Sequence, residues 1–233
     1  KSYDLDLKHE GGEIIVNATL TMDSETAPLP SKLVFSLNPG LEITSVSVNG
    51  IEVEYQRNIH LLEISKPANI SGPTKIEIGY AGEIDERICY LDLTDDDLSL
   101  RHAPDFILSS QKRYGIVEDA YVLLTPESVW YPLSGGTYGS RLSKIPVKQF
   151  SEYSLTVETA DGQMAISQGS VEQSENNWAF SSETPYHGIS LLIGNYETEV
   201  LDLDSLKIEL SYIEGHGGFL VSLDLMSDTL PFI

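Results

Sequence analysis

The sequence contains almost no cysteine and little positive charge. Cys89 is the single cysteine, so the 233-residue chain can form neither an internal disulfide nor a cysteine-based zinc site. Lysine and arginine number 14 against 36 aspartates and glutamates, which gives a net charge of -22 at pH 7. Because so negative a surface repels phosphate backbones and anionic lipid head groups, we expect no nucleic acid partner.

Long apolar runs are scarce as well. No stretch approaches the roughly 18 apolar residues of a membrane-spanning helix, so no direct membrane insertion by this segment is expected. The chain starts at Lys1 and shows no charged and then apolar leader, which is the pattern of a mature protein or of an excised part of a longer one. The hydrophobic fraction of 41% is still sufficient to build a core.

Strict alternation of apolar and polar residues takes the place of helical periodicity. Residues 13–22 place Ile14, Val16, Ala18, Leu20 and Met22 on one face and Asn17, Thr19 and Thr21 on the other, which is typical of a strand with one buried face. The pairs Gly11-Gly12 and Asn49-Gly50 separate alternating runs and predict tight hairpins, because both central residues of a type I′ turn need a positive φ. Further strands are predicted at residues 3–8, 33–37, 41–48, 51–55, 59–64, 75–80, 153–157, 163–167, 177–181, 189–193 and 206–212.

This spacing predicts an all-β protein, an antiparallel curved sheet or β-sandwich. Residues 1–82 and 120–212 are expected to be two parts of one assembly, since no flexible glycine- and serine-rich linker separates them. Residues 94–118 lack clean alternation, and a long excursion with one short helix is predicted there.

A short helical tail is predicted at the end of the chain. The apolar residues between positions 219 and 233 have the spacing of one helix face. We therefore expect a β-domain over residues 1–212 and the truncated start of a following domain over residues 213–233.

Several segments stand in a characteristic order. They are LEITSVSVNG at 41–50, KIEIGYAGEI at 75–84, Trp130-Tyr131-Pro132, and the runs 150–157, 165–169 and 189–197. In this order they resemble the N-terminal β-domain of the aminopeptidase N family of zinc metallopeptidases, the gluzincins, over about residues 3–212. The family's aspartate-glutamate-proline cluster and its upstream substrate-facing glutamine are absent here.

One stretch is more similar to divergent bacterial members of that family. Residues 124–132, followed by Gly135-Gly136, resemble members in which a peptidase-like region is fused behind the permease segments of a membrane transporter. That resemblance implies an extracytoplasmic location on the periplasmic face, in a parent protein attached to the membrane.

The family resemblance implies a saddle-like domain that is not itself catalytic. Such a domain would brace the catalytic domain of the same protein, which is missing from this chain, and would wall one side of its peptide cleft. The resemblance places zinc in that catalytic domain, implies no cofactor in this chain, and makes peptides the substrates of the parent. The alternative is a stand-alone surface β-sandwich module that binds carbohydrate or protein, and a third interpretation is a purely structural domain of a transporter assembly.

Three residues are candidates for the substrate side of a cleft. Trp130 and Tyr131 carry large amphipathic rings that could stack on a ligand, and packing in the core or at a hinge is the alternative. Glu127 carries a carboxylate that would suit the free amine of a peptide, and an ordinary surface glutamate is the alternative. No residue of this chain is a catalytic candidate.

Motifs for metal binding and nucleophilic catalysis are missing from the sequence. Zinc peptidases of this class need His-Glu-x-x-His on a helix, since histidines four residues apart share one face and both reach the metal. The chain has neither this motif nor a Gly-x-Ser-x-Gly elbow. The run Asp95-Asp96-Asp97 could offer oxygens to calcium, but it lacks the EF-hand spacing, and a solvated loop is the alternative. The histidines are scattered at His9, His60, His102, His187 and His216.

Overall fold

The computed structural model describes residues 1–22, 30–67, 72–90, 114–135, 150–203 and 206–213. These residues form strands joined by turns and by two 3₁₀ helices, η1 (Glu86–Tyr90) and η2 (Pro126–Ser128), and the predicted all-β class is confirmed. Within the described ranges, no helix has the length and apolar character needed to cross a membrane.

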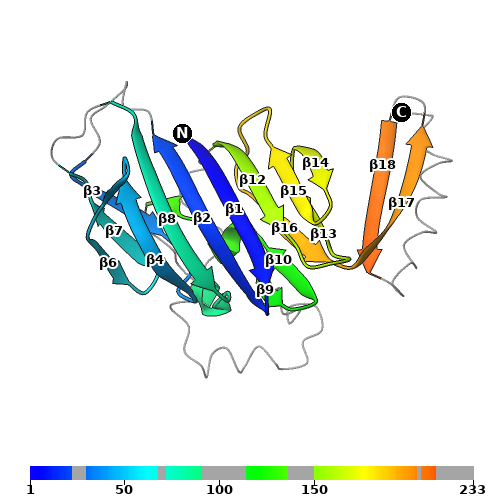
Figure 1. The fold of residues 1–233 in the computed structure, drawn as a ribbon, viewed down its shortest axis with the longest axis horizontal. Helices are drawn as coiled ribbons and strands as arrows, with labels where there is room; N and C mark the ends of the chain where they lie inside the picture. Colours follow the sequence, from blue (N-terminus) through cyan, green and yellow to red (C-terminus); the bar gives the residue numbers. More distant parts are fainter. Residues whose placement is uncertain (23–29, 68–71, 91–113, 136–149, 204–205, 214–233) are drawn as a thin grey trace.

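The largest sheet has eight strands in the order β14-β15-β12-β1-β2-β8-β4-β5 (Figure 1). Neighbouring strands are antiparallel except β1 and β12, which run parallel. The strands are β1 (Ser2–Glu10), β2 (Glu13–Met22), β4 (Leu41–Val48), β5 (Ile51–Glu52), β8 (Thr74–Gly82), β12 (Glu152–Glu158), β14 (Ser170–Ser174) and β15 (Asn177–Ser181).

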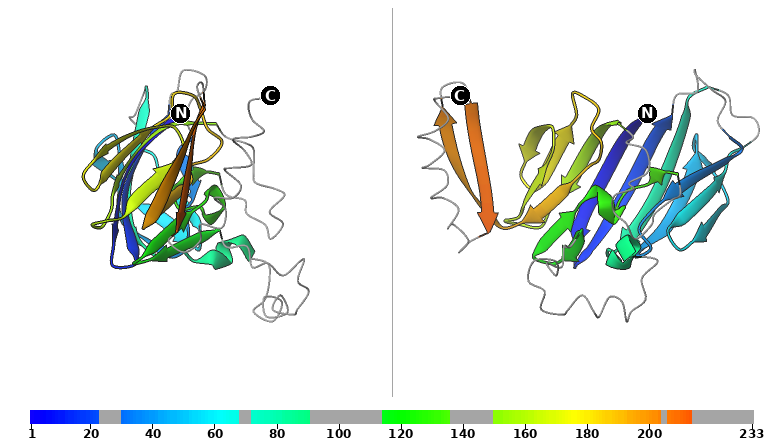
Figure 2. Two further views of the ribbon diagram at one scale, coloured as in Figure 1. Left: turned by 90° about the vertical axis from the view of Figure 1, so that its right-hand side faces the viewer. Right: turned by 180° about the vertical axis from the view of Figure 1, so that it is seen from behind.

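Two four-stranded sheets accompany the large sheet. One has the order β13-β16-β10-β9 and the other β11-β3-β7-β6. In the right-hand view of Figure 2, β9 and β10 stand in front of the large sheet. The strands are β3 (Lys32–Ser36), β6 (Tyr55–Asn58), β7 (Leu61–Ser65), β9 (Gly115–Glu118), β10 (Tyr121–Leu124), β11 (Leu133–Ser134), β13 (Met164–Ser167) and β16 (Leu191–Gly194).

One hydrophobic core is built from inward-facing side chains of all three sheets. The alternation in β2 is realised as predicted, with Ile14, Val16, Ala18 and Leu20 each no more than 1% exposed. Both predicted hairpin turns are confirmed, because Gly11, Gly12, Asn49 and Gly50 all have φ between 50° and 77°.

The two halves of the chain meet in the middle of the large sheet. Strand β1 pairs with β12 in parallel, with Leu5 opposite Leu155. Strands from residues 1–82 and from residues 120–194 therefore share the large sheet and one core, as the absence of a flexible linker predicted. The last strands of the second part, β17 (Tyr196–Leu203) and β18 (Leu206–Ile213), lie outside that sheet.

The segment predicted as one strand at 51–55 is instead divided between two sheets. Strand β5 ends at Glu52 and stays beside β4, whereas β6 begins at Tyr55 and pairs with β7. The chain changes sheets at Val53, whose N–H still donates to the carbonyl of Val46 at 3.2 Å. The period-two pattern of Ile51, Val53 and Tyr55 gave no sign of this change, and the structure leaves Ile51 and Tyr55 exposed, at 55% and 41%.

Several strands were not predicted. The last four residues of the expected excursion at 94–118 form β9, which pairs with β10. Strand β14 has no buried residue, so no alternation marks it in the sequence. The helix expected within 219–233 and the acidic run 95–97 lie outside the described residues.

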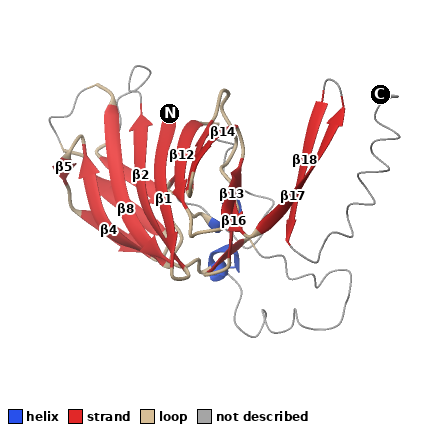
Figure 3. Ribbon diagram, turned by 45° about the vertical axis from the view of Figure 1, so that its right-hand side comes forward, coloured by secondary structure: helices blue, strands red, loops and turns tan. Residues whose placement is uncertain are grey.

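A separate hairpin projects beyond the sandwich. It consists of β17 (Tyr196–Leu203) and β18 (Leu206–Ile213), which pair only with each other among the described strands (Figure 3). Its first residue packs on the sandwich, where the rings of Tyr196 and Tyr121 meet edge to face with centroids 6.4 Å apart.

Candidate functional site

The three predicted site residues lie on one loop that follows strand β10. Thr125 fixes the start of this loop, since its backbone N–H and its Oγ1 both donate to the carbonyl oxygen of Tyr114, at 3.1 and 2.8 Å. The 3₁₀ helix η2 follows, and the Oγ of Ser128 donates back to the carbonyl of Thr125 at 2.7 Å. Glu127 stands in the middle of this single turn and is partly exposed.

A buried asparagine ties this loop to two others. The Oδ1 of Asn38 accepts from the backbone N–H groups of Gly40 and Asp85, at 2.9 and 2.8 Å. Its Nδ2 donates to the carbonyls of Asp85 and Ser128, at 3.2 and 2.7 Å. The residue has 0% exposure, so all four bonds lie in a region where an unpaired polar group would be costly. Asn38 thereby holds the β3–β4 turn, the loop before η1 and η2 together.

Val129 turns the chain sharply inward after η2. Its φ of 55° and ψ of 41° lie in the left-handed region, which is a genuine outlier for a β-branched residue. The conformation is held from both sides, because the Val129 N–H donates to Pro126 at 3.1 Å and the Val129 carbonyl accepts from the Asn38 N–H at 2.9 Å. Strained residues of this kind persist only where the surroundings over-determine them.

Beyond that turn, Trp130 and Tyr131 enter the core. Their exposures are 0% and 3%, and their rings meet edge to face with centroids 5.0 Å apart. Both bond to one residue before β16: Trp130 Nε1 donates to the carbonyl of Ile189 at 2.9 Å, and the Ile189 N–H donates to the Tyr131 hydroxyl at 3.2 Å. Burial, more than the nearby Glu127 carboxylate, raises the pKa of Tyr131 to about 12.

Strand β1 completes this aromatic group. The rings of Tyr3 and Tyr131 meet edge to face at 5.3 Å, and the Tyr3 hydroxyl donates to the carbonyl of Pro132 at 2.9 Å. The structure therefore places the Trp130 and Tyr131 rings where the packing alternative put them, with no face open to a ligand. Of the three candidates, only Glu127 reaches the surface.

Sequence reasoning missed Asn38, Ile189 and Gly188 as partners of this loop. Gly188 packs so closely that a Cβ there would lie 2.5 Å from the Cγ of Pro126. Asn38, Pro39 and Gly40 are residues typical of a turn, but nothing in the sequence connects that turn to Ser128, 90 positions later.

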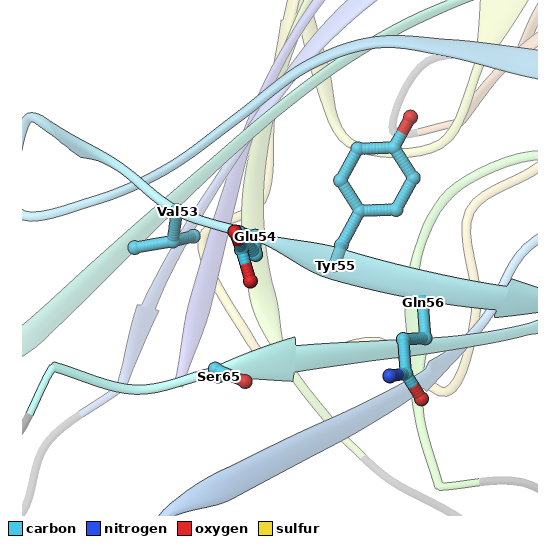
Figure 4. Close-up of a pocket in the computed structure, with 5 residues that line it drawn as sticks. All are labelled: Val53, Glu54, Tyr55, Gln56 and Ser65. Atoms are coloured by element: carbon cyan, nitrogen blue, oxygen red, sulfur yellow. The ribbon is translucent and has the colours of Figure 1, made fainter.

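Two depressions lie elsewhere on the surface. One, of about 360 Å³, is lined by Val53, Glu54, Tyr55, Gln56 and Ser65, where the chain passes between sheets (Figure 4). In Figure 4 the Tyr55 ring stands away from the other labelled side chains. The other, of about 540 Å³, lies at the ends of β4 and β8, and its lining includes the acidic residues Glu13, Glu42, Glu83 and Asp85.

The described residues do not provide a zinc site. No three histidine, cysteine, aspartate or glutamate side chains among them gather as metal ligands. His9 is buried and structural, with its ring nitrogens 3.2 Å from Gln163 Oε1 and 3.0 Å from the Glu118 carbonyl. His187 lies against the ring of Phe150.

No protein-family profile and no curated protein sequence matches this chain. Solved structures do resemble it in fold. The M1 zinc metallopeptidase from Deinococcus radiodurans has a TM-score of 0.61 and 15% identity, covering 98% of this chain and 52% of its own. A two-domain M1 zinc metallopeptidase bound to L-tryptophan has a TM-score of 0.61 and 16% identity, and the match covers 98% of this chain and 52% of that one. Legionella pneumophila aminopeptidase A has a TM-score of 0.57 and 16% identity, and the match covers 90% of this chain and 23% of that one.

These likenesses establish the fold. The chain has the fold of the N-terminal part of M1 zinc metallopeptidases, as its sequence motifs predicted. It spans about half the length of the Deinococcus radiodurans enzyme that it matches.

Proposed function

We propose that this chain is the N-terminal domain of a zinc aminopeptidase-like protein, that it braces a following catalytic domain and that it forms one wall of that domain's peptide cleft. One observation carries the proposal: almost the whole chain superposes on half of a two-domain metallopeptidase. In this proposal the matched half is the one without zinc, and its task is mechanical: it holds the other half and shapes the space beside it.

The proposal assigns zinc to the second domain. No ligand cluster for that ion was found among the described residues. In this proposal the chain contributes shape and charge to the cleft. In this proposal the β-domain covers residues 1–212, and residues 213–233 begin the next domain.

Glu127 is the residue through which this domain would face a peptide. This residue stands on a loop whose backbone is held by Asn38 and by the buried pair Trp130 and Tyr131, so the loop is in place before any ligand arrives. A partly exposed carboxylate suits a cation, and the free amine of a peptide is a cation near neutral pH. The two rings serve the site indirectly, by holding the loop.

The proposal also covers location. The resemblance of residues 124–136 to transporter-fused bacterial peptidase-like proteins supports an extracytoplasmic domain of a membrane-attached parent. Recovery of the parent protein in the cytosolic fraction of its cells, rather than with the membrane, would argue against this part of the proposal.

The decisive test is to read the coding sequence beyond Ile233 and to purify its full product. We expect a His-Glu-x-x-His helix within the next domain, one zinc per molecule after dialysis, and hydrolysis of an aminoacyl chromogenic substrate that a chelator abolishes. The 233-residue chain, measured beside it, should show neither activity nor stoichiometric zinc. A stop codon or a repeated sandwich after Ile233 would contradict the proposal and favour a stand-alone binding module.

A further inference from the structure

Strand β14 forms one edge of the large sheet. It pairs with β15 on one side, no described strand pairs with its other side, and all five of its residues are exposed (Figure 3). The strand at the opposite edge, β5, has only two residues. Proteins commonly protect their edge strands with proline, lysine or a bulge. Strand β14 has the sequence SVEQS and a regular register with β15, so none of these three protects it.

The backbone of β14 has hydrogen-bonding groups that point away from the sheet. Directly after β15, the Ser182 N–H donates to the carbonyl of Tyr153 at 3.0 Å. Because these directions alternate along a strand, the even-numbered residues of β15 bond towards β12 and the odd-numbered residues bond towards β14. The odd-numbered residues lie opposite the even-numbered residues of β14. The N–H and C=O groups of Val171 and Gln173 therefore point to the free edge.

An uncovered apolar position lies at this edge as well. Val171 and Gln173 lie opposite Phe180 and Trp178, which are buried, so all four side chains belong to the inner face of the sheet. The cover over that face ends before β14, since Val171 is 54% exposed. A strand added to this edge would place a side chain beside Val171 and cover it.

The outer face of the same edge is acidic. Residues 149–206 contain ten aspartates and glutamates and neither lysine nor arginine. Glu172 is exposed on this face opposite the small Ala179, and the Oε1 of Glu183 lies 3.5 Å from the Oγ of Ser170 at one end of the strand. Opposite charges on adjacent strands attract each other, so this face favours cationic side chains on an added strand.

We infer that the free edge of β14 is a binding site for an extended peptide strand in which apolar and cationic residues alternate. The peptide backbone bonds to Val171 and Gln173, its apolar residues lie on the inner face beside Val171, and its cationic residues face Glu172 on the outer face. Addition of a strand to an exposed sheet edge is a recurring mode of peptide recognition. This inference goes beyond the proposed function and does not depend on a second domain.

A second copy of this chain is a poorer occupant of the edge. Two β14 strands that pair antiparallel through both Val171 and Gln173 are centred on Glu172, so the two Glu172 carboxylates lie directly opposite each other. Like charges in directly opposite positions destabilise a sheet. Each copy also carries a net charge of -22, and like-charge repulsion opposes the association of two copies.

The test uses a short synthetic peptide of alternating lysine and valine, blocked at both ends. Calorimetry measures its affinity for the 233-residue chain, and NMR spectra follow hydrogen exchange at the N–H groups of Val171 and Gln173. We expect saturating peptide to slow exchange at these two groups at least about tenfold, because pairing protects them from solvent. A peptide of the same charge with N-methylated valines cannot donate these backbone bonds, and it is the control.

Two variants of the chain test the edge itself. Val171→Pro removes an N–H that points to the free edge and spares the bonds to β15, so the affinity for the peptide should fall at least about tenfold. Glu172→Lys reverses the charge that the peptide faces and should weaken binding at least about fivefold. Glu52→Lys makes the same change on β5, at the opposite edge of the sheet, and should leave the affinity unchanged. Circular dichroism and urea unfolding verify that each variant is folded.

Three outcomes would overturn the inference. Unchanged exchange at Val171 and Gln173 with saturating peptide would mean that the peptide does not pair with this edge. Equal binding of the N-methylated peptide, or equal weakening by Glu52→Lys and Glu172→Lys, would mean that the acidic surface as a whole attracts the peptide. Protection of both N–H groups without peptide, together with a dimer in sedimentation, would identify a second copy as the occupant.

Discussion

Replacing Asn38 by alanine should cost far more stability than replacing an exposed asparagine. The substitution removes four hydrogen bonds at once and leaves the N–H groups of Gly40 and Asp85 and the carbonyls of Asp85 and Ser128 without their side-chain partner. An unsatisfied buried group costs about 1–3 kcal/mol, and some of these groups, being only part-buried, will regain water. We therefore expect a loss of about 3–5 kcal/mol in the free energy of unfolding.

A loss of this size is readily measured, because domains are commonly stable by only about 5–15 kcal/mol. Urea unfolding followed by the fluorescence of Trp130 and Trp178 should show a lower midpoint with an unchanged slope. The melting temperature should fall by about 6–20 °C, at roughly 2–4 °C per kcal/mol for a chain of this length.

Asn177→Ala is the matched control, since Asn177 is exposed on strand β15, and it should change stability by less than about 0.5 kcal/mol. Asn38→Asp separates the two halves of the network. The carboxylate keeps both acceptor bonds but faces the carbonyls of Asp85 and Ser128 without a proton to donate, so this variant should also be clearly destabilised. If Asn38→Ala lost less than about 1 kcal/mol, the three loops would not depend on this residue, and the reasoning about the site's rigidity would be refuted.

Three further substitutions test the same region. Both Val129 and Val122 are fully buried, but only Val129 has a left-handed backbone, so only Val129→Gly relieves strain. In urea unfolding, Val129→Gly should therefore be less destabilising than Val122→Gly by at least about 1 kcal/mol. Equal losses in the two variants would show that the Val129 backbone is not strained. Burial raises the pKa of Tyr131 to about 12, above the value of about 10 in an unfolded chain, so its stabilising effect is complete below pH 10 and is lost towards pH 12. Tyr131→Phe should therefore be less stable at pH 8 yet lose stability less steeply above pH 10, and parallel pH profiles would contradict this. Gly40→Ala should lower the melting temperature by several degrees, because its Cβ would lie 2.4 Å from the carbonyl oxygen of Glu83, and an unchanged value would show that this backbone moves easily.

Sequence patterns predicted those strands whose apolar and polar residues alternate along the chain. Strand β2 matches its predicted bounds, and the turn at Asn49-Gly50 has the predicted positive φ values. Strand β14 was missed because it is exposed along its whole length, so burial leaves no pattern in it. The division at Val53 was missed because Ile51, Val53 and Tyr55 alternate with glutamates through the change of sheet, although Ile51 and Tyr55 are exposed. The alternation of residues along a strand thus indicates which side chains are buried, but it does not indicate which strand is the neighbour in the sheet.

The candidate site shows the same limit at larger sequence separation. The Trp130-Tyr131-Pro132 motif suggested aromatic rings that could stack on a ligand, but the structure buries both rings. What buries them is Tyr3, which is more than 120 positions earlier, and Ile189, which is nearly 60 positions later. No spacing rule within the loop could have predicted those contacts, since they arise only when β1, β12 and β16 have assembled.

Burial of these rings changes how the loop can serve a cleft. An exposed aromatic ring would be fixed only when a ligand packs on it. A buried ring is fixed by the core and can therefore fix the loop to which it belongs. Here the buried Trp130 and Tyr131, the strained Val129 and the four-bonded Asn38 all constrain the one turn that carries Glu127. A turn fixed in this way loses little backbone freedom when the Glu127 carboxylate meets a cation, which favours binding through preorganisation. The rigid loop therefore suits the proposed function, in which this domain forms a wall of a peptide cleft and presents the charge of Glu127 there.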